Sequence, residues 1–120
     1  MSDEERILDR LMVPDAVLES IRSQGGVEAL LQAIPADREL QREAVLHKAL
    51  SDPVRLRIMH ALLHSDLCPC VMKEVHPMAD SRLSYHLSKL EEAELVEFDR
   101  DKNWRVYRLT ERGRQVMGTF

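Results

Sequence analysis

Apolar residues recur every three or four positions along most of the chain, and near its end they alternate with polar ones. The first pattern predicts amphipathic helices and the second predicts strands. The spacing is interrupted at Pro14, at Gln24-Gly25-Gly26, at Pro35 and at Ser65-Asp66, which are typical turn or stop signals. We therefore expect helices over about residues 2–12, 15–23, 27–34, 36–50, 53–64 and 69–75.

The strongest helix start lies at Ser51-Asp52-Pro53. A carboxylate at the N-cap accepts hydrogen bonds from free backbone amides, and proline at the first helical position presets φ. Apolar residues cover most of the circumference of the helix that follows, so we expect it to be the buried central helix. Its margins carry two arginines and two histidines, namely Arg55, Arg57, His60 and His64.

Residues 80–90 form an amphipathic pattern of a different kind. At about 100° per residue, Leu83, Leu87 and Leu90 fall in one narrow stripe. The opposite side carries cations, hydroxyls and a phenol, from Ser81, Arg82, Tyr85, Ser88 and Lys89. These groups hydrogen-bond phosphates and base edges, so we interpret the segment as a DNA recognition helix. Taken alone, the pattern fits an ordinary solvated helix about as well.

The end of the chain predicts a hairpin and a last helix that Thr110-Glu111 caps. Two short strands are indicated around the polar segment 99–103 by Val96, Phe98, Val106, Tyr107 and Leu109. The order helix, helix, turn, helix, hairpin, helix is that of a winged helix-turn-helix. The expected fold is therefore mainly α with a small β-hairpin. It divides into an N-terminal helical extension for dimerisation, residues 1–46, and a DNA-binding winged helix-turn-helix, residues 47–120.

A net charge of -4 argues against indiscriminate binding of nucleic acid, but the charge is uneven. Residues 1–46 carry five arginines and ten acids, whereas residues 81–120 carry eight cations and seven acids. The acidic, apolar-striped helices of residues 1–46 suit internal packing or a dimer interface. No apolar run approaches the ~20 residues that span a bilayer, and the N-terminus does not resemble a secretory signal. We therefore expect a cytoplasmic protein with no membrane partner.

Three segments together resemble the ArsR/SmtB family of bacterial and archaeal repressors. They are HKALSDPVRLRIMHALL, SRLSYHLSKLEEAELVEF and NWRVYRLTERG, and they cover about residues 47–113. The resemblance implies a homodimeric winged helix whose effector changes its affinity for an operator. Ser84-Tyr85-His86-Leu87 matches the family's recognition-helix motif, and residues 99–105 match its wing. The candidate DNA-binding residues are Ser81, Arg82, Ser84, Tyr85, His86, Lys89, Arg100, Lys102 and Arg105.

The segment Leu67-Cys68-Pro69-Cys70 resembles the family's motif for a metal or metalloid. It departs from that motif because arsenic-sensing members commonly have a third cysteine in the next turn, where this chain has none. The last helix also lacks the histidines and acids of members that bind metal there. In a regular helix, side chains two residues apart point about 200° apart. With Cys68 at the helix cap, however, both sulfur atoms can converge as thiolates.

Three interpretations of Cys68 and Cys70 stay open. The pair binds a thiophilic metal or metalloid ion, with His64 as a third ligand. It forms a thiol–disulfide redox switch, or the two residues are small buried hydrophobes. A structural disulfide is the less expected state for a cytoplasmic protein.

The leading hypothesis is a homodimeric, sequence-specific transcriptional repressor that a thiophilic ion at Cys68 and Cys70 releases from its DNA operator. The alternatives are a redox-responsive regulator and a winged helix used for protein contacts. A thiol enzyme is disfavoured, because Cys-Pro-Cys lacks the spacing of a thioredoxin-like motif and no βαβ pattern surrounds it. We therefore expect the protein not to be an enzyme.

Overall fold

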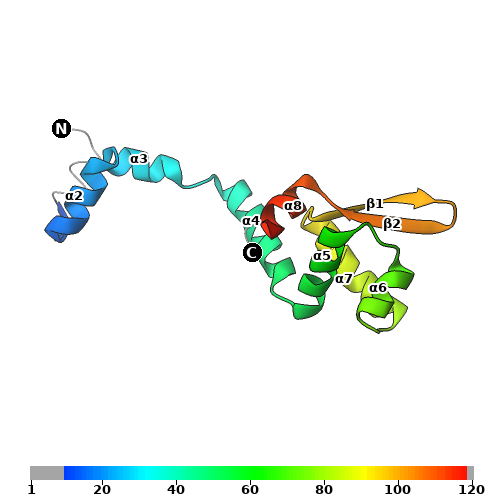
Figure 1. Cartoon of the computed structure of the whole chain (residues 1–120). Coiled ribbons are helices and arrows are strands. Elements are labelled where there is room, and N and C mark those ends of the chain that lie inside the picture. The colour runs from blue at the N-terminus through cyan, green and yellow to red at the C-terminus, as the bar shows by residue number, and fades with distance from the viewer. Residues whose placement is uncertain (1–9, 119–120) are drawn as a thin grey trace. The chain divides into compact units, whose positions relative to one another are not determined.

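The structure is a computed structural model and describes residues 10–118 (Figure 1). The predicted helix over residues 2–12 lies for the most part outside these residues. The chain separates into two compact units, divided after Leu40. The first contains α2 (Asp15–Ser23) and α3 (Gly26–Ala33), which pack against each other, and the helix α4 (Asp37–Leu50) begins before the division and ends after it. These three helices agree with the predicted ranges.

The second unit is built around α5 (Pro53–His64). This helix contacts α6 (Pro69–Val75), α7 (Asp80–Glu92), α8 (Glu111–Met117) and the strand β2 (Trp104–Leu109). Ile58, Met59 and Leu62 are almost completely buried there. The Asp52 carboxylate accepts hydrogen bonds from the backbone amides of Val54 at 2.7 Å and Arg55 at 3.2 Å. The predicted cap and the predicted central helix are therefore both confirmed.

The helix-turn-helix consists of α6 (Pro69–Val75) and α7 (Asp80–Glu92), joined by the turn 76–79. The leucine stripe of α7 is buried as predicted, with Leu83, Leu87 and Leu90 at most 3% exposed. After α7 the backbone of Glu94 adopts a positive φ of 60°. Its carboxylate accepts hydrogen bonds from Arg42 on α4 and Arg112 on α8, so the end of α7 is tied to both helices.

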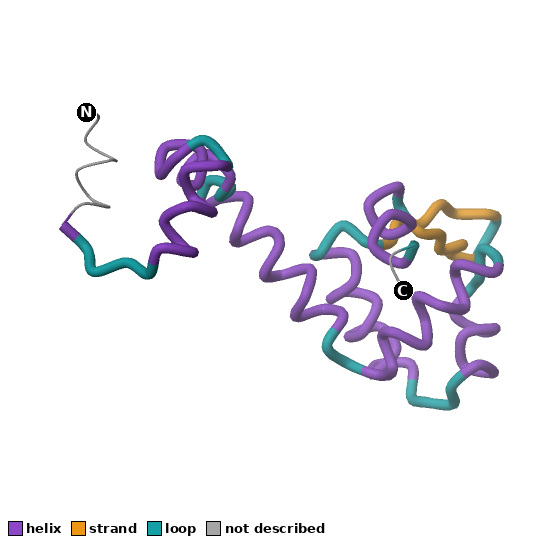
Figure 2. The backbone as a smooth tube through the Cα atoms, turned by 60° about the vertical axis from the view of Figure 1, so that its left-hand side comes forward, coloured by secondary structure: helices purple, strands orange, loops and turns teal. Residues whose placement is uncertain are grey.

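A two-stranded antiparallel hairpin follows, with β1 (Val96–Asp101) and β2 (Trp104–Leu109). In Figure 2 it appears in orange, beside the purple helices. The predicted polar loop 99–103 is too long, because pairing continues to Asp101 and Trp104 and leaves a two-residue turn. Lys102 occupies the left-handed region in this turn, at a φ of 57°.

The last helix, α8 (Glu111–Met117), begins where the Thr110 hydroxyl accepts a hydrogen bond from the Gly113 amide at 2.9 Å. A Cβ at Gly113 would lie 2.2 Å from the Leu95 carbonyl oxygen, so glycine permits this close packing. The predicted winged helix-turn-helix with helices before it is thus the observed fold. No helix among residues 10–118 is long and apolar enough to cross a membrane.

Candidate nucleic-acid interface and cysteine pair

The outward face of α7 carries the polar groups that the sequence pattern predicted. Ser81, Arg82, Ser84 and Tyr85 are exposed, and Lys89 is half-buried. The Lys89 ammonium lies 5.5 Å from the centroid of the Tyr85 ring, within the range of a cation–π contact. Two cations, several hydroxyls and an aromatic ring therefore lie on the outward face of this helix.

His86 does not belong to that surface. It is only 4% exposed, so its inclusion among the direct DNA contacts is wrong. Its Nδ1 atom accepts a hydrogen bond from Arg55 Nη1 at 3.0 Å, because a guanidinium can only donate. Burial lowers the pKa of His86, and the neighbouring Arg55 and Arg82 lower it further, whereas Asp52 opposes them. The ring is therefore neutral near pH 7.

Arg55 connects three elements beneath α7. Its Nε donates to the Ala49 carbonyl oxygen at the end of α4, at 2.6 Å, and its Nη1 donates to His86 on α7. The cap at Asp52 belongs to the same group. Burial raises the pKa of Asp52, but the amide hydrogen bonds from Arg55 and Val54, together with the charge of Arg55, lower it overall. Arg55 lies at the margin of α5 as the apolar pattern predicted, but nothing in that pattern indicates a contact with α4 or α7.

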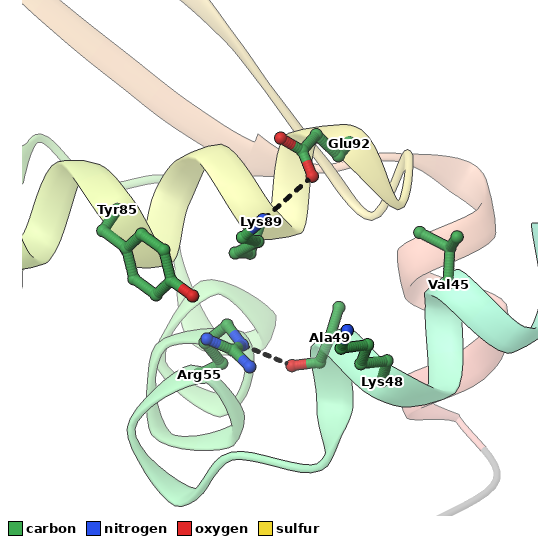
Figure 3. Close-up of a pocket in the computed structure, with 7 residues that line it drawn as sticks. All are labelled: Val45, Lys48, Ala49, Arg55, Tyr85, Lys89 and Glu92. Carbon is green, nitrogen blue, oxygen red and sulfur yellow. Dashed lines mark hydrogen bonds and ion pairs between the residues drawn. The ribbon is translucent and has the colours of Figure 1, made fainter.

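A pocket of about 210 Å³ lies against the exposed face of α7 (Figure 3). The Lys89 ammonium is 3.5 Å from the Glu92 carboxylate on its rim. The lining comes from α4, α5 and α7 and consists of Val45, Lys48, Ala49, Arg55, Tyr85, Lys89 and Glu92. Lys48 and Arg55 were not among the predicted site residues, because only the fold brings them to α7.

The hairpin separates its charges onto two faces. Arg108 on one face pairs with Glu97 at 3.1 Å and Asp99 at 2.6 Å. The hydrogen bonds that Arg108 donates to these carboxylates, with Asp99 contributing most, raise the pKa of Arg108. On the other face Arg100 stands directly opposite Arg105, whose guanidinium lies 4.7 Å from the Phe98 ring.

Like charges directly opposite each other destabilise a sheet, so the Arg100–Arg105 pair favours the approach of an anion. Lys102 adds a third cation at the turn. The three predicted wing residues are exposed and lie on or next to this hairpin tip. Their contact with DNA remains a prediction.

The cysteine pair lies where α6 begins. Cys68 is the N-cap, in an extended conformation, and Pro69 is the first helical residue. The two Cα atoms are 5.5 Å apart and the structure joins the sulfur atoms as a disulfide. The predicted convergence of the sulfurs at the helix cap is confirmed. Cys68 is half-buried and Cys70 is exposed, so the interpretation as buried hydrophobes is wrong for Cys70.

A shallow groove of about 460 Å³ connects this pair with the hairpin. Trp104 and Val106 of β2 line it together with both cysteines and Val71. Leu67, next to Cys68, forms a bridge to Tyr107 of β2 through backbone hydrogen bonds of 2.8 and 3.0 Å. The start of α6 is therefore fastened to the wing.

The proposed third ligand does not join the cysteines. Among residues 10–118, no three histidines, cysteines, aspartates or glutamates lie close enough to hold a metal ion, so the structure does not bring His64 to Cys68 and Cys70 as a third ligand. Within one chain the described residues offer two sulfur atoms and no closed three-ligand site.

A model of the family described as "Bacterial regulatory protein, arsR family" matches residues 52–97, from the cap of α5 into β1. The chain belongs to the ArsR family. The resemblance that the sequence segments indicated is confirmed.

Curated relatives of this ArsR-family chain are named as repressors. The putative arsenical resistance operon repressor ArsR of Halobacterium salinarum is 34% identical over 86 residues, 69% of this chain and 66% of that protein. The arsenical resistance operon repressor of Bacillus subtilis is 37% identical over 65 residues, 53% and 62% of the two chains. The match to the transcriptional repressor SmtB homolog of Synechocystis is 36% over 62 residues, 52% and 47%. The chain therefore spans less than two thirds of the length of these relatives.

Solved structures share the fold. The homodimeric winged helix-turn-helix DNA-binding domain of Mb0332 from Mycobacterium bovis, described as a possible ArsR-family transcriptional regulator, has a TM-score of 0.64 and 25% identity, covering 71% of this chain and 82% of that one. The transcriptional repressor BigR of Xylella fastidiosa has a TM-score of 0.60 and 28% identity, covering 69% and 86%. Relatives and fold are those of transcriptional regulators and not of enzymes.

Proposed function

We propose that this ArsR-family chain is a sequence-specific, DNA-binding transcriptional repressor that acts as a homodimer. The observation that carries the proposal is the outward face of α7, whose cation and hydroxyls project from a helix that buried leucines anchor. The exposed cation pair of the hairpin supports it, as do the names of the relatives. A repressor meets its operator in the cytoplasm, and that is where we expect the protein to act.

The contacts divide between base edges and phosphates. Two α7 helices of a dimer would enter successive major grooves, about 34 Å apart. Ser81, Arg82, Ser84, Tyr85 and Lys89 then reach base edges or the adjoining backbone, while Arg100, Lys102 and Arg105 hold flanking phosphates. Base contacts carry sequence preference, whereas phosphate contacts carry affinity for every sequence alike.

Dimerisation is assigned to the N-terminal helical extension, residues 1–46. Its helices leave large apolar side chains exposed, among them Leu30 and Leu31 of α3 and Ile34 at its C-cap. Exposed apolar side chains gathered on short helices suit burial against a second copy.

A pair of substitutions tests the repressor function on a duplex that the wild type selects from a random-sequence library. Arg82→Ala should weaken binding to that duplex by about 1–3 kcal/mol and broaden the sequence preference, because a base contact is lost. Lys102→Asn should weaken binding to selected and unrelated duplexes alike and lower the salt dependence by about one phosphate contact. Asparagine is chosen because it tolerates the positive φ at this position better than alanine does.

Salt titrations of fluorescence anisotropy measure both effects. If wild type and both variants bind equally, the assignment of the interface is wrong. If the wild type shows no salt-dependent binding to any duplex, the alternative of a winged helix for protein contacts replaces the repressor.

The regulatory signal is assigned to Cys68 and Cys70. The disulfide between them favours a redox switch, in which two thiols lose two protons and two electrons to a disulfide or peroxide oxidant. The relatives named for arsenical resistance favour a thiophilic ion, which two converging thiolates attract. Either signal would act through the groove that both cysteines share with Trp104, and hence on the wing.

A further inference from the structure

The pocket beside α7 gathers cations from three helices that are separate in the sequence. Lys48 comes from the last turn of α4, Arg55 from the first turns of α5, and Lys89 from α7. Figure 3 shows the Tyr85 hydroxyl directed toward Arg55, with Lys89 beside it. Three positive groups and a phenol hydroxyl therefore surround one small space.

One carboxylate opposes them. Glu92 lies 3.5 Å from Lys89 Nζ, and the two side chains are 59% and 40% exposed, so solvent weakens the pair. The pocket thus keeps an excess of positive charge. Its volume is about 210 Å³, well above the minimum of roughly 10–15 Å³ that one water molecule needs. That space is enough for a phosphate group with a few water molecules.

Arg55 is held in position before any ligand arrives. Nε donates to the Ala49 carbonyl oxygen and Nη1 donates to His86, so the plane of the guanidinium is fixed on two sides. These bonds leave Nη2 without a hydrogen bond to any of residues 10–118. A guanidinium oriented in advance loses little entropy when it binds a phosphate oxygen.

We propose that this pocket binds one backbone phosphate of the DNA duplex, with Lys48 and Arg55 as phosphate contacts outside the recognition helix. The inference rests on the proposed repressor function and adds a second point of attachment to it. The occupant follows from continuity: Tyr85 and Lys89 belong both to the pocket and to the α7 face that meets the duplex. The strands of a duplex carry phosphates along both edges of the major groove, so α7 cannot enter the groove without bringing phosphates near this surface.

The test replaces Lys48, whose side chain is exposed, and leaves the buried contacts of Arg55 intact. Lys48→Gln should reduce affinity roughly threefold to tenfold for selected and unrelated duplexes alike, and lower the slope of log K against log salt by about 0.9. Arg57→Gln is the matched control. Arg57 is also exposed, and at two residues after Arg55 it points to the opposite side of α5. The control should keep the wild-type slope.

A second variant tests the pocket in the opposite direction. Glu92→Gln removes the carboxylate that competes for Lys89, so affinity for every duplex should rise by a similar factor. If Lys48→Gln and Arg57→Gln both keep the wild-type slope, the phosphate pocket is refuted, although a wild type that still binds DNA retains its proposed function. If the wild type itself fails to bind duplexes, the repressor function is refuted first.

A titration with inorganic phosphate distinguishes a pocket for a DNA backbone phosphate from a pocket for a free phosphate ion. In an NMR titration of the protein without DNA, millimolar phosphate should shift the Tyr85 ring resonances only weakly. A free phosphate ion makes the contacts of the pocket but none of the other contacts that a duplex makes. Saturation of the pocket by free phosphate, together with duplex binding that Lys48→Gln leaves unchanged, would make it a site for a small anion and overturn the proposal.

Discussion

The hydrogen bond between Arg55 and His86 connects the stability of the second unit to pH. Burial lowers the pKa of His86 in the folded chain, Arg55, Arg82 and His76 lower it further, and Asp52 opposes them. The folded state therefore binds this proton less readily than the unfolded chain, whose histidine keeps the ordinary value of 6.5. The stability that the neutral ring contributes is complete above that pH. It is lost as the pH falls from 6.5 toward the pKa of the folded state.

Urea unfolding of the wild type and of His86→Gln, between about pH 7.5 and about pH 5, measures this contribution. The glutamine can still accept from Arg55 but does not titrate. The free energy of unfolding should therefore fall more steeply in the wild type than in the variant. The other histidines and the carboxylates are the same in both proteins. If the free energy of unfolding falls equally in both, His86 has the same pKa in the folded and the unfolded chain.

His86 also shows that the spacing of apolar residues does not predict the burial of every single residue. The resemblance to the family motif placed it in the recognition segment. Burial of a histidine needs a specific partner, and that partner is Arg55, 31 positions earlier in the chain. Spacing along one helix cannot reveal a contact between two helices. Lys48 was missed as a site residue for the same reason.

The first turn of α6 and the strand β2 form one mechanical connection, through the bridge between Leu67 and Tyr107 and the groove at Trp104. A change at the cysteines should therefore alter the wing and the affinity for DNA. We expect oxidant, arsenite or Cd²⁺ to change the affinity of the reduced wild type by about 5- to 150-fold. Cys68→Ser with Cys70→Ser should abolish the response and leave affinity without effector near that of the reduced wild type.

Trp104 supplies an independent measurement, because it is the one tryptophan of the chain and lies in the groove beside the cysteines. Its emission should change with the same effector that changes DNA binding, and should stay constant in the double variant. A double variant that still releases its duplex in response to all three agents would place the sensor elsewhere. If only the oxidant changes the DNA affinity of the wild type, the cysteines form a redox switch. If arsenite or Cd²⁺ changes it, they form an ion site.

Whole elements were more predictable than their connections. Each described helix follows from apolar spacing and stop signals, and Asp52-Pro53 identified the start of α5 within one residue. The hairpin was predicted, but its turn was drawn too long because Asp99, Arg100 and Asp101 are polar residues with low strand propensity. Cross-strand pairing, with Arg108 held by Glu97 and Asp99, outweighs that propensity.

For the whole molecule, a partner is needed to cover the apolar side chains that are exposed on α3 and at its C-cap. Leu31 and Ile34 are 58% and 54% exposed. Residues 1–46 carry five arginines and ten acids, and this net negative charge does not suit DNA. A second copy of the chain buries such side chains and also brings two α7 helices to one duplex. Leu31→Lys with Ile34→Lys should therefore convert the dimer to a monomer in sedimentation equilibrium.

The same double variant should lose affinity for a duplex with two half-sites by on the order of a hundredfold or more, because the second contact is no longer intramolecular. Binding to a single half-site should change little. Leu63→Lys, at an apolar position of α5 that is 40% exposed, is the matched control and should stay dimeric. Circular dichroism checks that both proteins keep their helices. A double variant that remains dimeric would assign the interface to the second unit, and the extension would then need another partner.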